Sequence, residues 1–194
     1  MSKFTNRKGK IRLLDGTGTP WHLEIDFDLG DFSGPVGIPK TDEILVLDRN
    51  QATADMHYIE GGDDKIMAPF PITFSALVVD KTQCLYLHDW IDVMNGLLSA
   101  TINSNTIVTT AEDTQRDGAN NNPPFADATK LLCNLQYKLD GPSTDLTFLY
   151  TEIWFPADQQ SISEAEDGVT ISLNGQCYGT VTRGTAWVAG STVE

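Results

Sequence analysis

The last quarter of the chain shows the clearest alternation of apolar and polar residues. Between positions 169 and 181 the apolar residues take every second position, which predicts a strand with one face on a core. Gly175 and Gly179 fall on the apolar side, where a missing side chain indicates a close backbone approach or a bulge. The opposite face, from Thr170 to Thr182, carries hydroxyls, amides and one tyrosine but no charge. The apolar set is Val169, Ile171, Leu173, Cys177 and Val181.

Alternation elsewhere predicts several more strands. In residues 20–29 it places apolar side chains inward and His22, Glu24, Asp26 and Asp28 outward. The apolar run 43–48 predicts a short buried strand. The polar stretch 49–65 predicts a long projecting hairpin or loop, with a weak strand at 56–59. Further strands are predicted at 72–79, 133–139 and 145–155.

One segment has a helical period. Residues 86–98 place apolar side chains at helical spacing, and Gly96 is a possible stop. We interpret this stripe as core rather than as a cofactor site. Its members are Leu87, Trp90, Ile91, Met94, Leu97 and Leu98.

About eight strands and one helix follow from these patterns. The turn residues between them favour antiparallel pairing, so the sequence predicts an antiparallel β-sandwich or small barrel. It would have one flanking helix, the long hairpin loop and terminal arms. The expected boundaries are a basic N-terminal arm at 1–12, the β-sandwich domain at 13–188 and a C-terminal tail at 189–194.

The charge balance adds a contrast between the N-terminus and the remainder. The chain has 13 Lys and Arg against 27 Asp and Glu, a net charge of −14, and such a surface repels free nucleic acid. Five of the 13 basic residues lie in the first 12 positions. This segment is either a solvated terminus or an arm that docks on the acidic surface of a neighbouring copy. The arm residues are Arg7, Lys8, Lys10 and Arg12.

No motif for catalysis, metal binding or a cofactor stands out. The three cysteines are far apart and odd in number, which favours free thiols in a reducing compartment. Asp26 and Asp28 are only neighbours on one strand face, without further ligand spacing. No apolar run reaches the length of a membrane span, and the N-terminus lacks a secretory signal. We therefore expect a protein without enzymatic activity, metal or cofactor, made in a cytoplasm.

The order of elements resembles a known family. A long strand ending in EIWFP is followed by the polar linker QQSISEAEDG and by the strand GVTISLNGQCYG. Before them come an acidic strand, a short apolar strand, a polar hairpin with GGDD, a Pro-led strand and a single helix. Over most of the chain this order is similar to the major tail tube proteins of long, flexible-tailed bacteriophages. The polar loop at 110–128 departs from the pattern, because it is long for a minimal tube subunit.

The resemblance implies a structural virion protein of the phage tail, assembled in the host cytoplasm. Hexameric rings would stack into a hollow tube that first holds the tape-measure protein and later passes DNA. The implied partners are further copies of the chain, the tape-measure protein, the tail terminator and distal tail proteins, and viral DNA without sequence-specific binding. No membrane is involved.

Two sets of residues follow as expectations for such a tube. A basic channel would hold DNA by counterion release, whereas an acidic or neutral channel would let it slide. The lumen candidates are therefore Glu24, Asp26 and Asp28, with the uncharged face from Thr170 to Thr182 as the second choice. Contacts to the next ring are expected from the projecting segment, at Met56, His57, Tyr58, Asp63 and Asp64.

Two other functions remain open on the sequence alone. A carbohydrate-binding β-sandwich on a virion or cell surface could use tryptophan rings for stacking, although Trp90 and Trp154 are expected to be buried. A hydrolase could use scattered acids such as Asp63, Asp64 and Glu152, but no pair has a spacing that fixes a catalytic geometry. The four tryptophans are Trp21, Trp90, Trp154 and Trp187.

Overall fold

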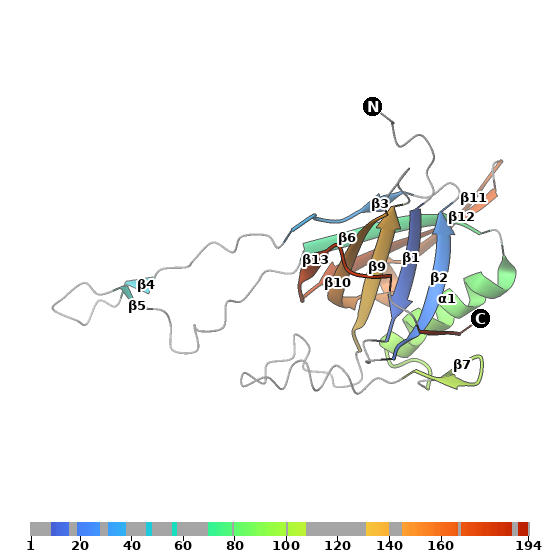
Figure 1. The fold of residues 1–194 in the computed structure, drawn as a ribbon. Helices are drawn as coiled ribbons and strands as arrows, with labels where there is room; N and C mark the ends of the chain where they lie inside the picture. Colours follow the sequence, from blue (N-terminus) through green and yellow to red (C-terminus); the bar gives the residue numbers. More distant parts are fainter. Residues whose placement is uncertain are drawn as a thin grey trace, which may run out of the picture.

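A computed structural model describes twelve stretches of the chain. They are residues 9–15, 19–27, 31–37, 46–47, 56–57, 70–78, 80–99, 101–107, 131–139, 145–166, 168–187 and 190–193. Half of the described residues form one large sheet, which lies beside a single α-helix (Figure 1).

The large sheet contains ten strands. They are β1 (Gly9–Leu14), β2 (Trp21–Phe27), β3 (Phe32–Ser33), β6 (Phe70–Leu77), β9 (Cys133–Leu139), β10 (Leu146–Trp154), β11 (Ser161–Ala165), β12 (Gly168–Cys177), β13 (Val181–Arg183) and β14 (Ser191–Thr192). Their order is β14-β2-β1-β9-β10-β12-β6-β3, with β11 beside β12 and β13 beside β10. All these pairs are antiparallel except β14 with β2.

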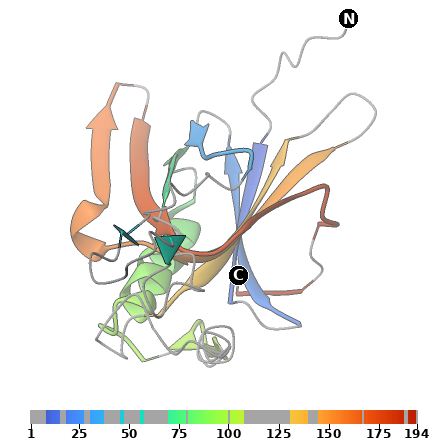
Figure 2. The same cartoon turned by 90° about the vertical axis from the view of Figure 1, so that its left-hand side faces the viewer.

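The sheet bends into two halves that enclose one core (Figure 2). The first half contains β2, β1, β9 and β10, and the second contains β11, β12, β6 and β3. Alternate residues of both halves point inward, as the period of 2 predicts. The mainly β, largely antiparallel fold with one flanking helix is therefore confirmed. The small barrel is wrong for the described strands, because β14 and β3 end the sheet without pairing with each other.

A bulge in β10 lies where the two halves meet. The register of β10 against β9 shifts between Tyr150 and Ile153, and Glu152 has a φ of 57°. The Glu152 N–H donates to Asn134 Oδ1 at 3.1 Å, and its carbonyl accepts from the Tyr178 N–H at 2.9 Å. Such bulges bend the strand that contains them, so this one lets β10 pair with β9 and β13 at one end and with β12 at the other.

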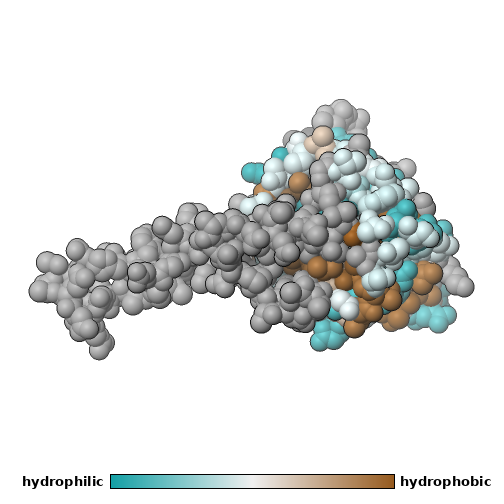
Figure 3. Space-filling view, turned by 90° about the horizontal axis from the view of Figure 1, so that it is seen from below, coloured by the Kyte–Doolittle hydropathy of each residue, from teal (hydrophilic) through white to brown (hydrophobic). Residues whose placement is uncertain are grey.

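The helix α1 (Lys81–Met94) begins five residues earlier than its apolar stripe predicts. The Asp80 side chain caps it by accepting a hydrogen bond from the Thr82 N–H at 2.7 Å. Trp90 is 2% exposed and faces the core, as expected. The predicted end of the helix is wrong, because α1 stops at Met94. Leu97 and Leu98 were expected in the core but are 66% and 45% exposed. Figure 3 shows apolar residues on the underside of the body, where Figure 1 places α1.

Two small hairpin sheets complete the described strands. One pairs β4 (Val46–Leu47) with β5 (Met56–His57), within the stretch where a short strand and a long hairpin were predicted. It pairs with no strand of the ten-stranded sheet and stands apart from it in Figure 1. The other pairs β7 (Thr101–Ile102) with β8 (Asn105–Thr106) near α1. A single-turn 3-10 helix, η1 (Ala157–Gln159), joins β10 to β11.

Both predicted domain boundaries are wrong. Residues 9–12 are not part of an arm, because they form most of β1, which lies between β2 and β9 in the sheet. Residues 190–193 are not a loose tail, because β14 pairs with β2 and Val193 is fully buried in the core. The charge pattern suggested an arm, but Ile11 and Leu13 fix the strand because both are fully buried.

Candidate functional site

The uncharged face was predicted from Thr170 to Thr182, but β12 ends at Cys177 and residues 181–183 form β13 beside β10, so only the part up to Gln176 lies on β12. From β12 this face continues over the neighbouring strands β6, β3 and β11. Cross-strand partners share a face, and Ser172 stands opposite Ser75 of β6 and Ser161 of β11. Asn174 stands opposite Thr73, which in turn stands opposite Ser33 of β3. We call this set the uncharged face. It consists of Ser33, Pro71, Thr73, Ser75, Leu77, Ser161, Ser163, Ala165, Gly168, Thr170, Ser172, Asn174 and Gln176.

Hydrogen bonds hold the polar groups of this face in place. The Gln160 side chain donates to the Asn174 carbonyl at 3.1 Å and accepts from the Asn174 N–H at 3.0 Å. The Asn174 side chain donates to the Gln159 carbonyl at 2.8 Å, and Ser75 Oγ accepts from the Asp31 N–H at 3.1 Å. The face is thus a fixed, neutral surface that is half-exposed on β12 and exposed on β11.

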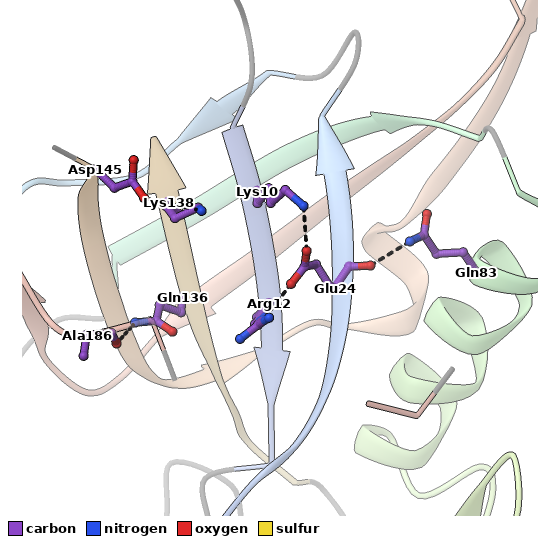
Figure 4. A network of polar contacts seen from close by, with 8 residues as sticks. All are labelled: Lys10, Arg12, Glu24, Gln83, Gln136, Lys138, Asp145 and Ala186. Carbon is purple, nitrogen blue, oxygen red and sulfur yellow. Dashed lines mark hydrogen bonds and ion pairs between the residues drawn. The ribbon is translucent and has the colours of Figure 1, made fainter. Parts of the chain in front are cut away.

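The same side of the sheet is charged in the other half. Glu24 of β2 accepts hydrogen bonds from Lys10 Nζ at 2.8 Å and from Arg12 Nε at 2.6 Å (Figure 4). Lys138 Nζ of β9 lies 3.5 Å from Asp145 Oδ2. We call this the charged face. It is partly enclosed, because the side chains of Arg12 and Glu24 are only 15% and 24% exposed.

The C-terminal segment crosses the charged face. We call residues 184–187 and 190–193 the strap. Near its start, fully buried Gln136 donates to the Ala186 carbonyl at 2.6 Å (Figure 4). In its middle, the Trp187 ring lies 4.5 Å from the Arg12 guanidinium carbon and 5.4 Å from Lys138 Nζ. At its end, the Val193 N–H donates to the His22 carbonyl at 3.0 Å. The strap therefore spans from β10 to β2 and covers part of the charged face.

The ion pairs change the protonation chemistry of Glu24. Burial alone would raise the pKa of its carboxyl group. The hydrogen bonds and positive charges of Lys10 and Arg12 outweigh burial, so the pKa is lowered overall. Glu24 is thus an ionised, neutralised carboxylate rather than a bare acidic group.

The described lumen and arm residues lie on the neighbouring strands β1 and β2. Glu24 lies on the charged face, and the backbone of Asp26 pairs with that of Lys10 in β1. Lys10 and Arg12 lie in β1 and contact Glu24 of their own chain. The side chain of Asp26 and all of Asp28, Arg7 and Lys8 lie outside the described residues.

The predicted contacts to the next ring fall mostly outside the description. Met56 and His57 form β5, of which the backbone alone is described. Tyr58, Asp63 and Asp64 lie outside the described residues, so these contacts stay predictions. Among the acids considered for a hydrolase, Glu152 lies in the β10 bulge.

The four tryptophans lie on four different elements. Trp90 faces the core from α1, as expected, and is inaccessible to a sugar ring. Trp154 of β10 was expected to be buried but is half-buried. Trp21 of β2 packs partly against the core, and Trp187 lies on the strap beside two cations.

Two features of the site were missed in the sequence. The extension of the uncharged face over β6 had a signal, because Pro71, Thr73 and Ser75 alternate with buried residues. The part on β11 lies in a stretch that looked like a linker. The only sequence signal for the strap was the large ring of Trp187, which needs a packing partner. No local pattern indicates that this partner is Arg12.

No family model, curated protein or solved structure matches this chain. In the described part of the chain, no group of three or more His, Cys, Asp or Glu side chains could hold a metal ion. No described helix is long and apolar enough to cross a membrane. The three cysteines are free, and Cys133 and Cys177 are buried.

Proposed function

We propose that this chain is the structural subunit of a bacteriophage tail tube. Copies close into six-membered rings, and the rings stack into a hollow tube that holds the tape-measure protein and then conducts DNA. The observation that carries the proposal is the uncharged face, which spans four strands of a chain with a net charge of −14. The mainly β fold and the order of elements support it.

The argument for the uncharged face is electrostatic. DNA binds strongly to surfaces that release its counterions, and such binding would stop its passage. A surface of hydroxyls and amides offers neither Lys and Arg contacts nor strong repulsion. A neutral wall within an acidic chain is therefore suited to a channel through which a polyanion slides.

The structure also changes the preferred lumen residues within this proposal. The face that carries Glu24 holds Lys10, Arg12 and Lys138, and the strap crosses it. An enclosed and ion-paired face is poorly suited to line an open channel. We therefore propose the uncharged face as the lumen lining, in place of the preferred acidic face of β2.

Electron microscopy of the concentrated protein tests the assembly. Hollow tubes with six-fold end views are expected. A protein that stays monomeric at every concentration, in both microscopy and sedimentation, would overturn the proposal. The tail terminator, distal tail and tape-measure partners follow only if tubes form.

Charge substitutions test the lumen assignment separately. Ser172→Lys and Thr73→Lys each place a cation at the centre of the uncharged face. Tubes of either variant should retain DNA in cosedimentation, and the retention should fall as salt is raised. Thr106→Lys on exposed β8 adds the same charge elsewhere and should leave DNA in the supernatant. Equal retention by all three variants would place the uncharged face outside the channel.

A further inference from the structure

The imidazole of His22 is buried beneath the end of the strap. His22 is 6% exposed. A methyl group built on Gly190 would lie 3.2 Å from His22 Nδ1 and 2.2 Å from the Pro20 carbonyl oxygen, so the strap backbone passes close to both. Among the described residues, His22 Nδ1 has no hydrogen-bond partner. A polar atom enclosed in this way is stable only while it carries no charge.

The strap end is held at this place by backbone contacts. The Ser191 N–H donates to the Pro20 carbonyl at 3.2 Å, and the Val193 N–H donates to the His22 carbonyl at 3.0 Å. These bonds form the short parallel pair of β14 with β2. Only two strand residues pair here, but Val193 is also fully buried, and Asn103 Nδ2 donates to its carbonyl at 2.8 Å. Opening of the strap end must therefore break these contacts too, and it remains a local event beside the central strands of the sheet.

We propose that His22 is an acid-sensitive latch for the strap. Protonation of the imidazole releases β14 and the strap end from β2, while the central strands of the sheet stay folded. The proposal does not depend on the tube function.

The charged groups around His22 favour release of the strap over a protonated imidazole that stays buried. Arg12 of neighbouring β1 already places one positive charge beside it. Glu24 of β2 attracts a second charge, but its carboxylate already accepts hydrogen bonds from Lys10 and Arg12. The described strap residues at 190–193 carry no ionisable side chain. A protonated imidazole therefore gains most by reaching water, and the strap end is the segment whose backbone lies against its Nδ1.

The direction of the pH effect follows from the pKa of His22. Burial lowers this pKa, the charge of Arg12 lowers it further, and Glu24 opposes both. A histidine with a lowered pKa contributes stability above its ordinary pKa, and this stability is lost as the pH falls through the lowered value. Between the two values, opening of the strap should become about tenfold more favourable per pH unit.

Hydrogen exchange of the unmodified chain measures this opening. Protection factors for the amides of Ser191 and Val193 are obtained between about pH 7.5 and pH 5, on either side of the ordinary histidine pKa of about 6.5. An unstructured peptide of the same C-terminal sequence, measured at each pH, corrects for the chemical exchange rate. Protection at Val193 should fall with pH, while protection in β1 and β9 stays constant.

Three glutamine variants assign the effect to one histidine. His22→Gln cannot gain a proton, so its protection at Val193 should not change with pH. His88→Gln removes the exposed histidine of α1 and should behave as the unmodified chain. Glu194→Gln, which removes the adjacent acidic side chain, should also keep the pH dependence. If protection at Val193 still depends on pH in His22→Gln, the proposal is overturned.

A measurement on the unmodified chain keeps the test decisive if His22→Gln does not fold. Nuclear magnetic resonance of the imidazole follows the protonation of His22 directly. Its midpoint should coincide with the loss of protection at Val193. A His22 that becomes protonated while Val193 stays protected would show that the latch does not exist.

Discussion

The ring of Phe155 fills the space in which a side chain at Gly175 would stand. A methyl group built on Gly175 would lie 2.6 Å from Phe155 Cε1 and 2.7 Å from Cδ1. Phe155 is fully buried and packs edge-on against Phe74, with ring centroids 5.9 Å apart. The glycine in β12 therefore leaves room for an aromatic residue in the core.

Gly175→Ala should consequently destabilise the fold. The added methyl group must displace a buried ring, which costs about 1–3 kcal/mol of unfolding free energy. Gly37→Ala is the matched control, because nothing lies within 4 Å of the added methyl group there. Urea denaturation measures both variants. Equal midpoints for the two would contradict the packing role of Gly175.

The bulge in β10 holds Glu152 in the left-handed region, with a φ of 57°. This conformation costs a residue with a Cβ atom about 1–2 kcal/mol, and glycine adopts it freely. Glu152→Gly should therefore be about 1 kcal/mol more stable than Glu152→Ala. Both variants lose the same carboxylate, so thermal or urea denaturation isolates the backbone effect. A less stable glycine variant would show that this backbone conformation is not strained.

The ion pairs of Glu24 predict a defined response to acid. Because its pKa is lowered in the fold, the carboxylate stabilises the fold above its ordinary pKa and loses this effect as the pH falls through the lowered value. Glu24→Gln should cost about 1–2 kcal/mol at neutral pH. The difference from the unmodified chain should shrink below about pH 4.3, the ordinary pKa of a glutamate.

Denaturation curves at several pH values measure this difference. Glu164→Gln on exposed β11 removes the same charge from a site without these partners and serves as the control. A Glu24→Gln difference that stays constant down to strongly acidic pH would show that the ion pairs do not stabilise the fold.

Gln136 ties the start of the strap to the sheet. Its side chain donates to the Ala186 carbonyl at 2.6 Å and to Thr185 Oγ1 at 3.2 Å. Gln136→Met keeps the length of the side chain but removes both donors, which should lower the unfolding free energy by about 1–3 kcal/mol. Hydrogen exchange should rise first in residues 184–187. Unchanged exchange there would show that Gln136 is not what fixes the strap.

The elements of the fold were predictable where one face of the chain meets the core. The alternation in residues 133–139 defines β9, because Cys133 and Leu135 are buried and Asn134 lies between them. Gly175 lies inward against Phe155, as its position in the pattern indicated. Gly179 lies beyond the end of β12, where its backbone closely approaches the Thr151 carbonyl. Local periodicity decides these features, so a single sequence contains them.

The arrangement of the strands depends on contacts that no local pattern records. The five basic residues near the N-terminus suggested an arm, yet Lys10 and Arg12 are balanced by Glu24 on the adjacent strand. The alternation of β2 identified which residues point outward. It did not show that the strap crosses that face, because the partners of Trp187 lie far away in the sequence.

The position of β1 has a consequence for the order in which the protein can fold during synthesis. The first described strand pairs with β2 on one side and with β9 on the other, and β9 is translated much later. The strap, which fastens β2, is translated after β9. A nascent chain can therefore form the β1–β2 hairpin early, but must keep its apolar face from aggregating until β9 emerges from the ribosome. The sheet should be completed only after the strap has been translated, and a chain cut short before the strap would leave the charged face and the edge of β2 uncovered.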